Sequence, residues 1–252
     1  MLVSGVRMRG DAAEGRALRL SAALVRRLAI VSGVVLVTLG PGCGRAKMVP
    51  EDGARLVRDA PGYAVAERAG VRMAASGDVW KGRPADLPER LTPVKVRLVN
   101  RSGRDLQILY GRFVLVGARG RKYRPLPPVP PAQDASRAGM GTVRPYFAPS
   151  NFFVRPADHD VYPSLPPWPT RLRSDDVFYA RQYDRWGDEP PSRELQRLAL
   201  PEGVLASGGE IAGFLYFENA TGRESKLALR ADLRDEEGRE TVASISIPFR
   251  VE

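Results

Sequence analysis

The chain has 252 residues, of which 43% are hydrophobic and 27% are charged, and its formal net charge is +10. These values are typical of a globular protein of one or two domains, and they exclude a largely disordered chain or one that spans a membrane many times. Basic and acidic residues are interspersed. Nucleic-acid-binding proteins instead gather Lys and Arg into a stripe beside stacking aromatic residues. We therefore predict no nucleic-acid partner.

An apolar run lies near the N-terminus. Arg26 and Arg27 precede an uncharged stretch of twelve residues, from Leu28 to Leu39, and the small residues of Gly40-Pro41-Gly42 follow it. Twelve helical residues span about 18 Å, which is short of the roughly 30 Å hydrocarbon core of a bilayer. Basic residues, a short apolar run and small residues follow one another in the order of a secretory signal. We predict that residues 1–42 are a signal peptide.

Cys43 is the only cysteine, so the chain has no intrachain disulfide and no cysteine-based zinc site. Gly42 and Cys43 resemble the end of bacterial lipoprotein signals, in which the Cys receives a diacylglyceryl group and becomes the new N-terminus. Gly40 and Pro41 depart from that pattern, which has a small or hydroxylated residue and an aliphatic one in their places. The resemblance implies attachment to the cell envelope through a lipid on Cys43, and Gly44 in place of Asp implies the outer membrane, facing the periplasm.

Two alternatives to lipidation remain open. One is ordinary signal-peptide cleavage, with Cys43 as a free thiol. The other is an uncleaved N-terminal anchor, which would place Arg26 and Arg27 in or near the apolar layer at a cost of a few kcal/mol each.

Residues 43–90 lack a sustained period, and we predict a tether and lead-in, with a first strand near 63–65 or 71–73. From residue 91 the pattern becomes that of strands. Apolar residues alternate with Lys and Arg over 94–98, and further strand segments follow at 106–110, 113–116 and 122–123, separated by turn residues. Short strands at such close intervals predict an antiparallel all-β unit.

The C-terminal part continues this pattern. Residues 211–217 are apolar on both faces, which predicts a central strand, whereas 227–233 and 243–251 alternate as half-buried strands do. Asp235-Glu236-Glu237-Gly238 between them predicts a hairpin turn. Strand groups with one apolar face each should pack against one another. The pattern resembles immunoglobulin-like sandwich domains of bacterial lipoproteins, and the resemblance implies an immunoglobulin-like β-sandwich over 91–252.

A segment of different character, residues 124–199, interrupts the strands. It holds fourteen of the 22 prolines and many aromatic residues. Because proline removes backbone donors, we predict an irregular insertion. Near its end, Ser192 as N-cap and Pro201 after the last turn predict one helix over 193–200.

Four aromatic residues of the insertion form the candidate binding surface. Such side chains bury a large area at low entropic cost, and they could stack on sugar rings or dock a protein. The alternative is that they cover an open face or edge of the sheet, because an uncovered edge invites aggregation. The four residues are Trp168, Tyr179, Tyr183 and Trp186.

No catalytic motif is present in the sequence. The sole histidine, His159, stands between Asp158 and Asp160, where the side chains of an extended triplet point in different directions, so we predict a solvated loop and no metal site. The chain has neither a Gly-x-Ser-x-Gly elbow nor a phosphate-binding loop. We predict a non-enzymatic envelope protein without a cofactor, held at the membrane by its N-terminal lipid, that binds a protein or an envelope glycan. The alternative is a carbohydrate- or peptidoglycan-binding or hydrolytic function in the aromatic insertion.

Overall fold

The structure is a computed structural model, and it describes residues 46–57, 60–130, 142–170, 172, 176–187 and 189–252. All of these residues belong to one compact unit, Cys43–Glu252. The strands are β1 (Met48–Pro50), β2 (Ala64–Arg68), β3 (Val71–Ser76), β4 (Leu91–Asn100), β5 (Leu106–Ile108), β6 (Phe113–Gly117), β7 (Lys122–Tyr123), β8 (Ser150–Val154), β9 (Gly203–Glu218), β10 (Lys226–Asp235) and β11 (Thr241–Val251). The helices are α1 (Leu87–Arg90), α3 (Asp176–Tyr183) and α4 (Arg193–Leu198), with 3-10 turns η1 (Tyr110–Arg112), η2 (Pro156–Asp158) and η3 (Asp184–Trp186).

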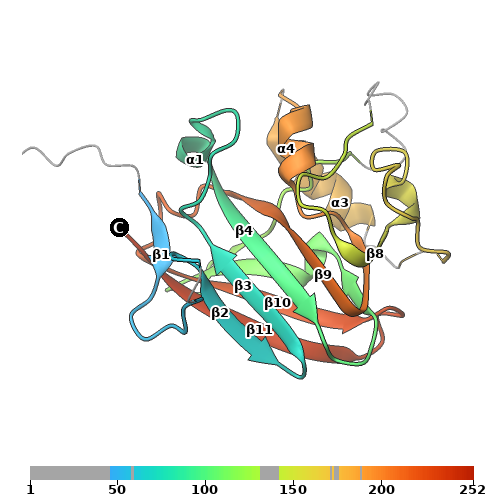
Figure 1. The fold of residues 1–252 in the computed structure, drawn as a ribbon. Coiled ribbons are helices and arrows are strands. Elements are labelled where there is room, and N and C mark those ends of the chain that lie inside the picture. The colour runs from blue at the N-terminus through green and yellow to red at the C-terminus, as the bar shows by residue number, and fades with distance from the viewer. Residues whose placement is uncertain (1–45, 58–59, 131–141, 171, 173–175, 188) are drawn as a thin grey trace, which may run out of the picture. The chain divides into compact units, whose positions relative to one another are not determined.

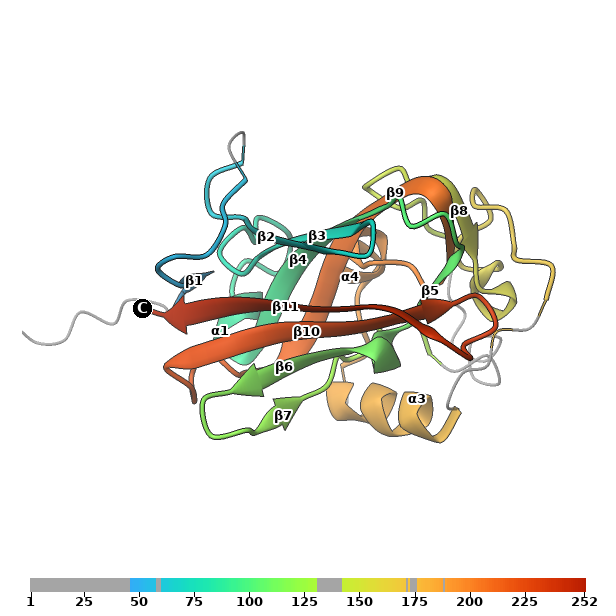
Figure 2. The same ribbon diagram turned by 90° about the horizontal axis from the view of Figure 1, so that it is seen from below.

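The strands form one antiparallel sheet that curls into a nearly closed, barrel-like wall (Figures 1 and 2). The strand order is β1-β11-β10-β5-β9-β4-β3-β2. In addition, β6 pairs with β10 and β7, and β8 pairs with β9. Although β2 and β11 are far apart in that order, they pack against each other, so the two ends of the sheet approach. Among the described residues, no helix is long and apolar enough to cross a membrane.

The predicted antiparallel all-β architecture is therefore confirmed, whereas its immunoglobulin-like form is not. A sandwich has two separate sheets. Here the sheet has two walls, one containing β9 and the other β10, and β5 pairs with both strands, so the walls form one hydrogen-bonded sheet. Strands β2 and β3 lie where a first strand was predicted, and the sheet begins at Met48, before residue 91.

The main core fills the inside of the barrel-like wall. In β10 and β11 the inward residues are apolar and buried and the outward ones are mostly polar, which is the alternation expected for strands with one wet face. The central strand β9 differs, because Leu215 and Phe217 belong to the main core while Phe214 and Tyr216 belong to a second apolar cluster. The prediction that residues 211–217 are apolar on both faces of a central strand is thus confirmed.

Helix α4 covers this second cluster on the outer side of β9. Ser192 caps the helix, since its Oγ accepts a hydrogen bond from the backbone N–H of Leu195, as the sequence predicts. The chain then runs directly against β9, where a Cβ at Gly213 would lie 2.4 Å from the backbone of Leu200. Glycine at 213 is therefore required for this close approach. The insertion is not wholly irregular, since it also supplies β8, which pairs with β9.

Candidate anion-binding groove

The lipidation residue predicted from the sequence, Cys43, lies outside the described residues, as does the whole predicted signal peptide. The four aromatic residues of the insertion are all described, and they do not gather on one surface. Tyr179, on α3, is 4% exposed and belongs to the main core. Trp168 packs on a separate small cluster with Leu109 and Val204, and its ring contacts Phe153 edge to face at 5.4 Å.

The other two aromatic residues lie on or just after α3. Trp186 packs on the second apolar cluster, 5.9 Å from the ring of Tyr216, and its indole N–H donates to the carbonyl of Pro127 at 2.8 Å. Tyr183 is half-buried. Of the four, Trp186 lines a groove of about 300 Å³ beside Pro190, Pro191 and Leu195.

His159 makes a structural contact, with Nδ1 lying 3.1 Å from the carbonyl oxygen of Leu165. Its neighbour Asp158 is buried and paired with Arg155. Within the described ranges, no group of three His, Cys, Asp or Glu residues is placed to hold a metal ion.

Arg155, Asp158 and Glu202 form a buried ionic cluster under the insertion. They are 6%, 3% and 2% exposed. The Arg155 guanidinium donates two hydrogen bonds to Asp158, of 3.0 and 2.7 Å, and its Nη1 lies 3.3 Å from Oε2 of Glu202. Glu202 also accepts the backbone N–H of Tyr110. The cluster joins the segment after β8, the loop before β9 and the turn η1.

Burial and pairing shift the pKa values in this cluster. Burial raises the pKa of Glu202 to about 8, although the Arg155 charge opposes the rise. Burial acts to lower the pKa of Arg155, but the charges of Glu202 and Asp158 outweigh it and raise that pKa. Oε2 of Glu202 is buried without a hydrogen bond, although it lies near the charge of Arg155. Because all three side chains are buried, the cluster fits a structural role.

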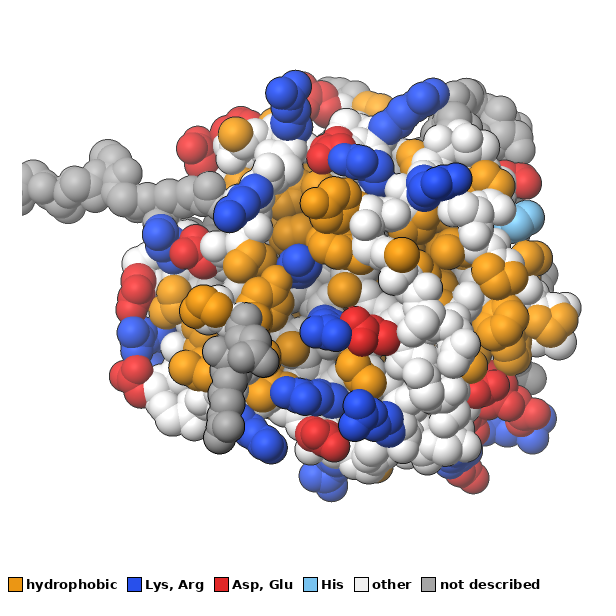
Figure 3. All heavy atoms as spheres, in the orientation of Figure 1, with side chains coloured by type: hydrophobic (Ala, Val, Ile, Leu, Met, Phe, Trp, Pro, Cys, Tyr) orange, Lys and Arg blue, Asp and Glu red, His pale blue; other side chains and the backbone are white. Residues whose placement is uncertain are grey.

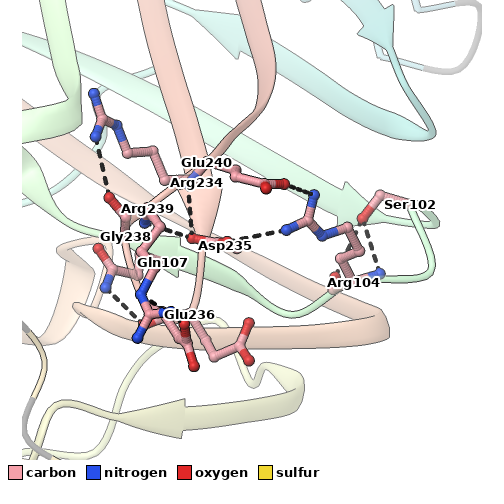
Figure 4. Close-up of polar contacts among 10 residues, drawn as sticks. Ser102, Arg104, Gln107, Arg234, Asp235, Glu236, Gly238, Arg239 and Glu240 are labelled. Atoms are coloured by element: carbon pink, nitrogen blue, oxygen red, sulfur yellow. Dashed lines mark hydrogen bonds and ion pairs between the residues drawn. The ribbon is translucent and has the colours of Figure 1, made fainter.

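A second polar cluster stabilises the β10–β11 hairpin (Figure 4). Oδ1 of Asp235 accepts the backbone N–H groups of Arg239 and Glu240, at 2.8 and 3.2 Å, and Oδ2 accepts a hydrogen bond of 2.9 Å from Arg104. Gln107 donates to the carbonyl of Glu236 at 2.7 Å. The predicted turn at 235–238 is confirmed. Most polar groups of this cluster bond one another, whereas Oε1 of Gln107 and Nε of Arg234 are buried without a hydrogen bond.

An open groove of about 520 Å³ lies on the outer face of β6, β10 and β11, the strands that face the viewer in Figure 2. Its walls carry five basic residues and one acidic residue. The basic residues are Arg112, Lys122, Arg124, Arg230 and Arg234, and the acidic one is Asp232.

Sheet register explains why these charges meet. Arg230, Asp232 and Arg234 alternate along β10 and so point to the same outer face, with about 13 Å between the outermost two. Arg230 pairs with Ser246 of β11, and Asp232 pairs with Ser244. Arg112 immediately precedes β6, and Lys122 lies on β7, the next strand outward.

The basic side chains of this groove have no acidic partner among the described residues. Asp232 instead accepts a 2.5 Å hydrogen bond from Ser244. Burial lowers the pKa of Arg112, and the positive charge of Arg234 lowers it further. The negative charge of Asp232 raises this pKa but does not offset the other two effects. The groove therefore holds an uncompensated positive field, which favours an anion.

In the groove beside β3 and β4, the basic residues Arg72, Arg97 and Arg101 are nearly balanced by Glu67 and Glu210. Arg97, in a groove beside β3 and β4, forms a bidentate pair with Glu210 at 2.7 and 2.9 Å. Near Trp186, Arg90 lies 3.5 Å from Glu189 and Arg185 lies 2.7 Å from Glu218. Figure 3 views the face formed by β2, β3 and β4, where blue and red side chains lie side by side among hydrophobic ones. The groove on β6, β10 and β11 is thus distinguished by its excess of five basic residues over one acidic residue.

This groove could not be recognised in the sequence. Arg230, Asp232 and Arg234 alternate with apolar residues in the sequence, but this alternation indicates only that one face of the strand is exposed to solvent. Arg112, Lys122 and Arg124 come from other elements and join the groove through strand pairing. No protein-family model matches the chain, and neither a curated protein nor a solved structure shows significant similarity to it.

Proposed function

We propose that this chain is an exported, non-enzymatic binding protein of the bacterial cell envelope, anchored by a lipid on Cys43, that holds an anionic envelope component in the groove on β6, β10 and β11. The observation that carries this proposal is the set of five basic side chains around that groove without an acidic partner among the described residues. Guanidinium groups remain protonated at all physiological pH values, so they bind anions well and are poor acid–base catalysts.

The lipid anchor is supported by the signal-like sequence and by the place where the sheet begins. Strand β1 starts at Met48, five residues after Cys43, and pairs with the end of β11 through Met48 and Val251. Five residues reach at most about 17 Å. A lipid on Cys43 would therefore hold the folded unit close to the membrane, which we propose is the outer membrane with the protein facing the periplasm.

The anchor is tested by metabolic labelling with a radioactive fatty acid in a bacterial host, comparing the wild-type chain with Cys43→Ser. Label in the wild type and its loss in the variant are expected. Equal label in both proteins would contradict the lipid anchor and would not bear on anion binding by the groove.

The groove is tested by retention of the full chain, in an uncharged detergent, on immobilised dextran sulfate at low and high salt. The double variant Arg112→Gln/Arg230→Gln should elute at clearly lower salt than the wild type. Its control is Arg68→Gln/Arg193→Gln, which removes the same charge from exposed sites on β2 and α4. If both double variants lost retention equally, net charge alone would explain binding and the groove would be excluded.

A second candidate function is glycan binding at the groove beside Trp186, because an indole bordered by Pro190, Pro191 and Leu195 could stack on a sugar ring. Peptidoglycan fragments should then shift tryptophan fluorescence in the wild type and not in Trp186→Phe. An unchanged wild-type spectrum across a broad glycan panel would contradict this candidate.

We also propose that the barrel-like sheet is a variant of the immunoglobulin-like sandwich, with its two walls joined through β5. An experimental structure in which the two walls pack face to face, with their strands within about 30° of each other, would support this proposal. One in which β2 and β11 are hydrogen-bonded, so that the sheet closes into a barrel, would contradict it.

A further inference from the structure

We infer that the groove on β6, β10 and β11 binds a terminal phosphate group, and that in the envelope this is the monoester headgroup phosphate of an anionic lipid. The inference deepens the proposed function and rests on it, because it names the chemistry of the anion that the same groove takes.

The charges of the groove suit a ligand with several anionic oxygens. Five basic residues face a single carboxylate, Asp232, and that carboxylate already accepts a hydrogen bond from Ser244. One carboxylate ligand would offer two oxygens and neutralise one of these charges. A terminal phosphate, inorganic or monoester, offers at least three non-bridging oxygens around one centre and can be approached from several sides of the groove at once.

The kind of donor also favours phosphate. Four of the five basic residues are Arg, whose planar fork of N–H groups matches phosphate oxygens in a bidentate manner better than the point charge of Lys. Arg234 is held in place, since its Nη1 donates to the carbonyl of Gly238 at 3.1 Å. The hydroxyl of Ser246, exposed on β11 opposite Arg230, adds a neutral donor.

The groove lacks what a nucleic acid requires. Single-stranded nucleic acids are bound by basic grooves in which aromatic rings stack on the bases. Among the residues that the structure describes, those that line this groove include no aromatic side chain. We therefore expect the groove to recognise a phosphate group and not a nucleotide base.

The position of the groove favours a lipid as the source of the phosphate. Strand β11 carries Ser246 in the groove and Val251 beside the start of β1, so the groove lies about 17 Å along one strand from the point where the anchored segment joins the sheet. The five residues from Cys43 to Met48 can extend to at most about the same distance, roughly 17 Å. Headgroups of the membrane that holds the protein are then within reach of the groove.

The test is calorimetric titration of the full chain in an uncharged detergent at low ionic strength. The probes are inorganic phosphate, dihexanoyl phosphatidic acid below its critical micelle concentration, citrate as a polycarboxylate, and a 20-nucleotide single-stranded DNA. We expect both phosphate probes to bind, the lipid more tightly, and citrate to bind at least about tenfold more weakly. Arg112→Gln should weaken phosphate binding about tenfold, and the control Arg193→Gln should leave it unchanged.

Asp232→Asn provides a test that does not depend on damage to the fold. Asp232 is the one acidic side chain among the described residues that line the groove. Its removal should tighten phosphate binding several-fold, since nearby like charge opposes the anion. Glu67→Gln, which makes the same change in net charge on β2, should not. Equal effects of the two substitutions would overturn a local site.

The remaining outcomes separate this inference from the proposed function. Retention on dextran sulfate that depends on Arg112 and Arg230, without measurable binding of either phosphate probe, would overturn the phosphate inference and leave the proposed function standing. If the retention did not depend on Arg112 and Arg230 and neither phosphate probe bound, both the proposed function and the phosphate inference would be overturned. Binding of inorganic phosphate with no gain for the lipid would overturn the lipid source, and tighter binding of the DNA than of the lipid would overturn the inference in favour of a nucleic acid.

Discussion

The guanidinium of Arg155 lies over the ring of Tyr179, 4.3 Å from its centroid. The contact connects α3 to the segment that follows β8, and on its other sides the same guanidinium meets Asp158 and Glu202. One buried cation therefore links three separate parts of the chain around the insertion. Its removal should have a large effect on stability.

Arg155→Met should destabilise the fold by about 3–5 kcal/mol, because it leaves the carboxylate of Asp158 buried without its partner. The measurement is the free energy of unfolding from denaturant titration. The triple variant Arg155→Met/Asp158→Asn/Glu202→Gln, which removes every charge of the cluster, should recover a substantial part of the loss. A loss below about 1 kcal/mol in the single variant would show that the cluster is not a major contributor.

Stability should fall as the pH rises from about 5 to 8. Burial raises the pKa of Glu202 to about 8, above its ordinary value of 4.5. Between those values the folded state holds a proton that the unfolded state has released, so raising the pH favours unfolding, by up to about 1.4 kcal/mol per unit. Glu202→Gln does not titrate and should lose this slope. Equal slopes in the two proteins, measured by denaturation at several pH values, would contradict the prediction.

The cap of α4 predicts a smaller effect. Ser192→Ala removes the acceptor for the N–H of Leu195 and should cost about 0.5–1 kcal/mol of unfolding free energy. Ser192→Asp keeps an acceptor and adds a negative charge at the helix N-terminus, so its stability should be close to that of the wild type. A loss as large in the Asp variant as in the Ala variant would show that the cap is unimportant.

The β10–β11 hairpin depends on Gly238, which has a φ of +72°. Gly238→Ala should cost about 1 kcal/mol or more, since a side chain is strained there and its Cβ would lie 3.2 Å from the Gln107 amide. Gly120→Ala is a matched control, because its φ is +79° and a Cβ there meets no atom within 4 Å. Thermal unfolding should therefore show a larger loss at 238 than at 120.

Several elements could be predicted from local pattern because their causes are local. Alternation over 227–233 and 243–251 placed β10 and β11 with the correct faces inward, and the Asp-Glu-Glu-Gly turn joined them. Ser192 predicted the start of α4, since an N-cap contacts an amide only three residues away. The tertiary structure also places each of the four aromatic residues of the insertion, with Tyr179 in the core and Trp186 against Tyr216, which their sequence positions could not decide.

The sequence by itself determined an antiparallel all-β protein with a central strand apolar on both faces, and it predicts the export signal and Cys43 as the anchor. Only the tertiary structure decided that β5 joins the walls into one curled sheet, and that Arg112, Lys122, Arg124, Arg230 and Arg234 border one groove. The physical reason is the range of the interactions. Strand alternation and helix capping act between residues a few positions apart, whereas the groove is built from side chains on strands that pair across more than a hundred residues.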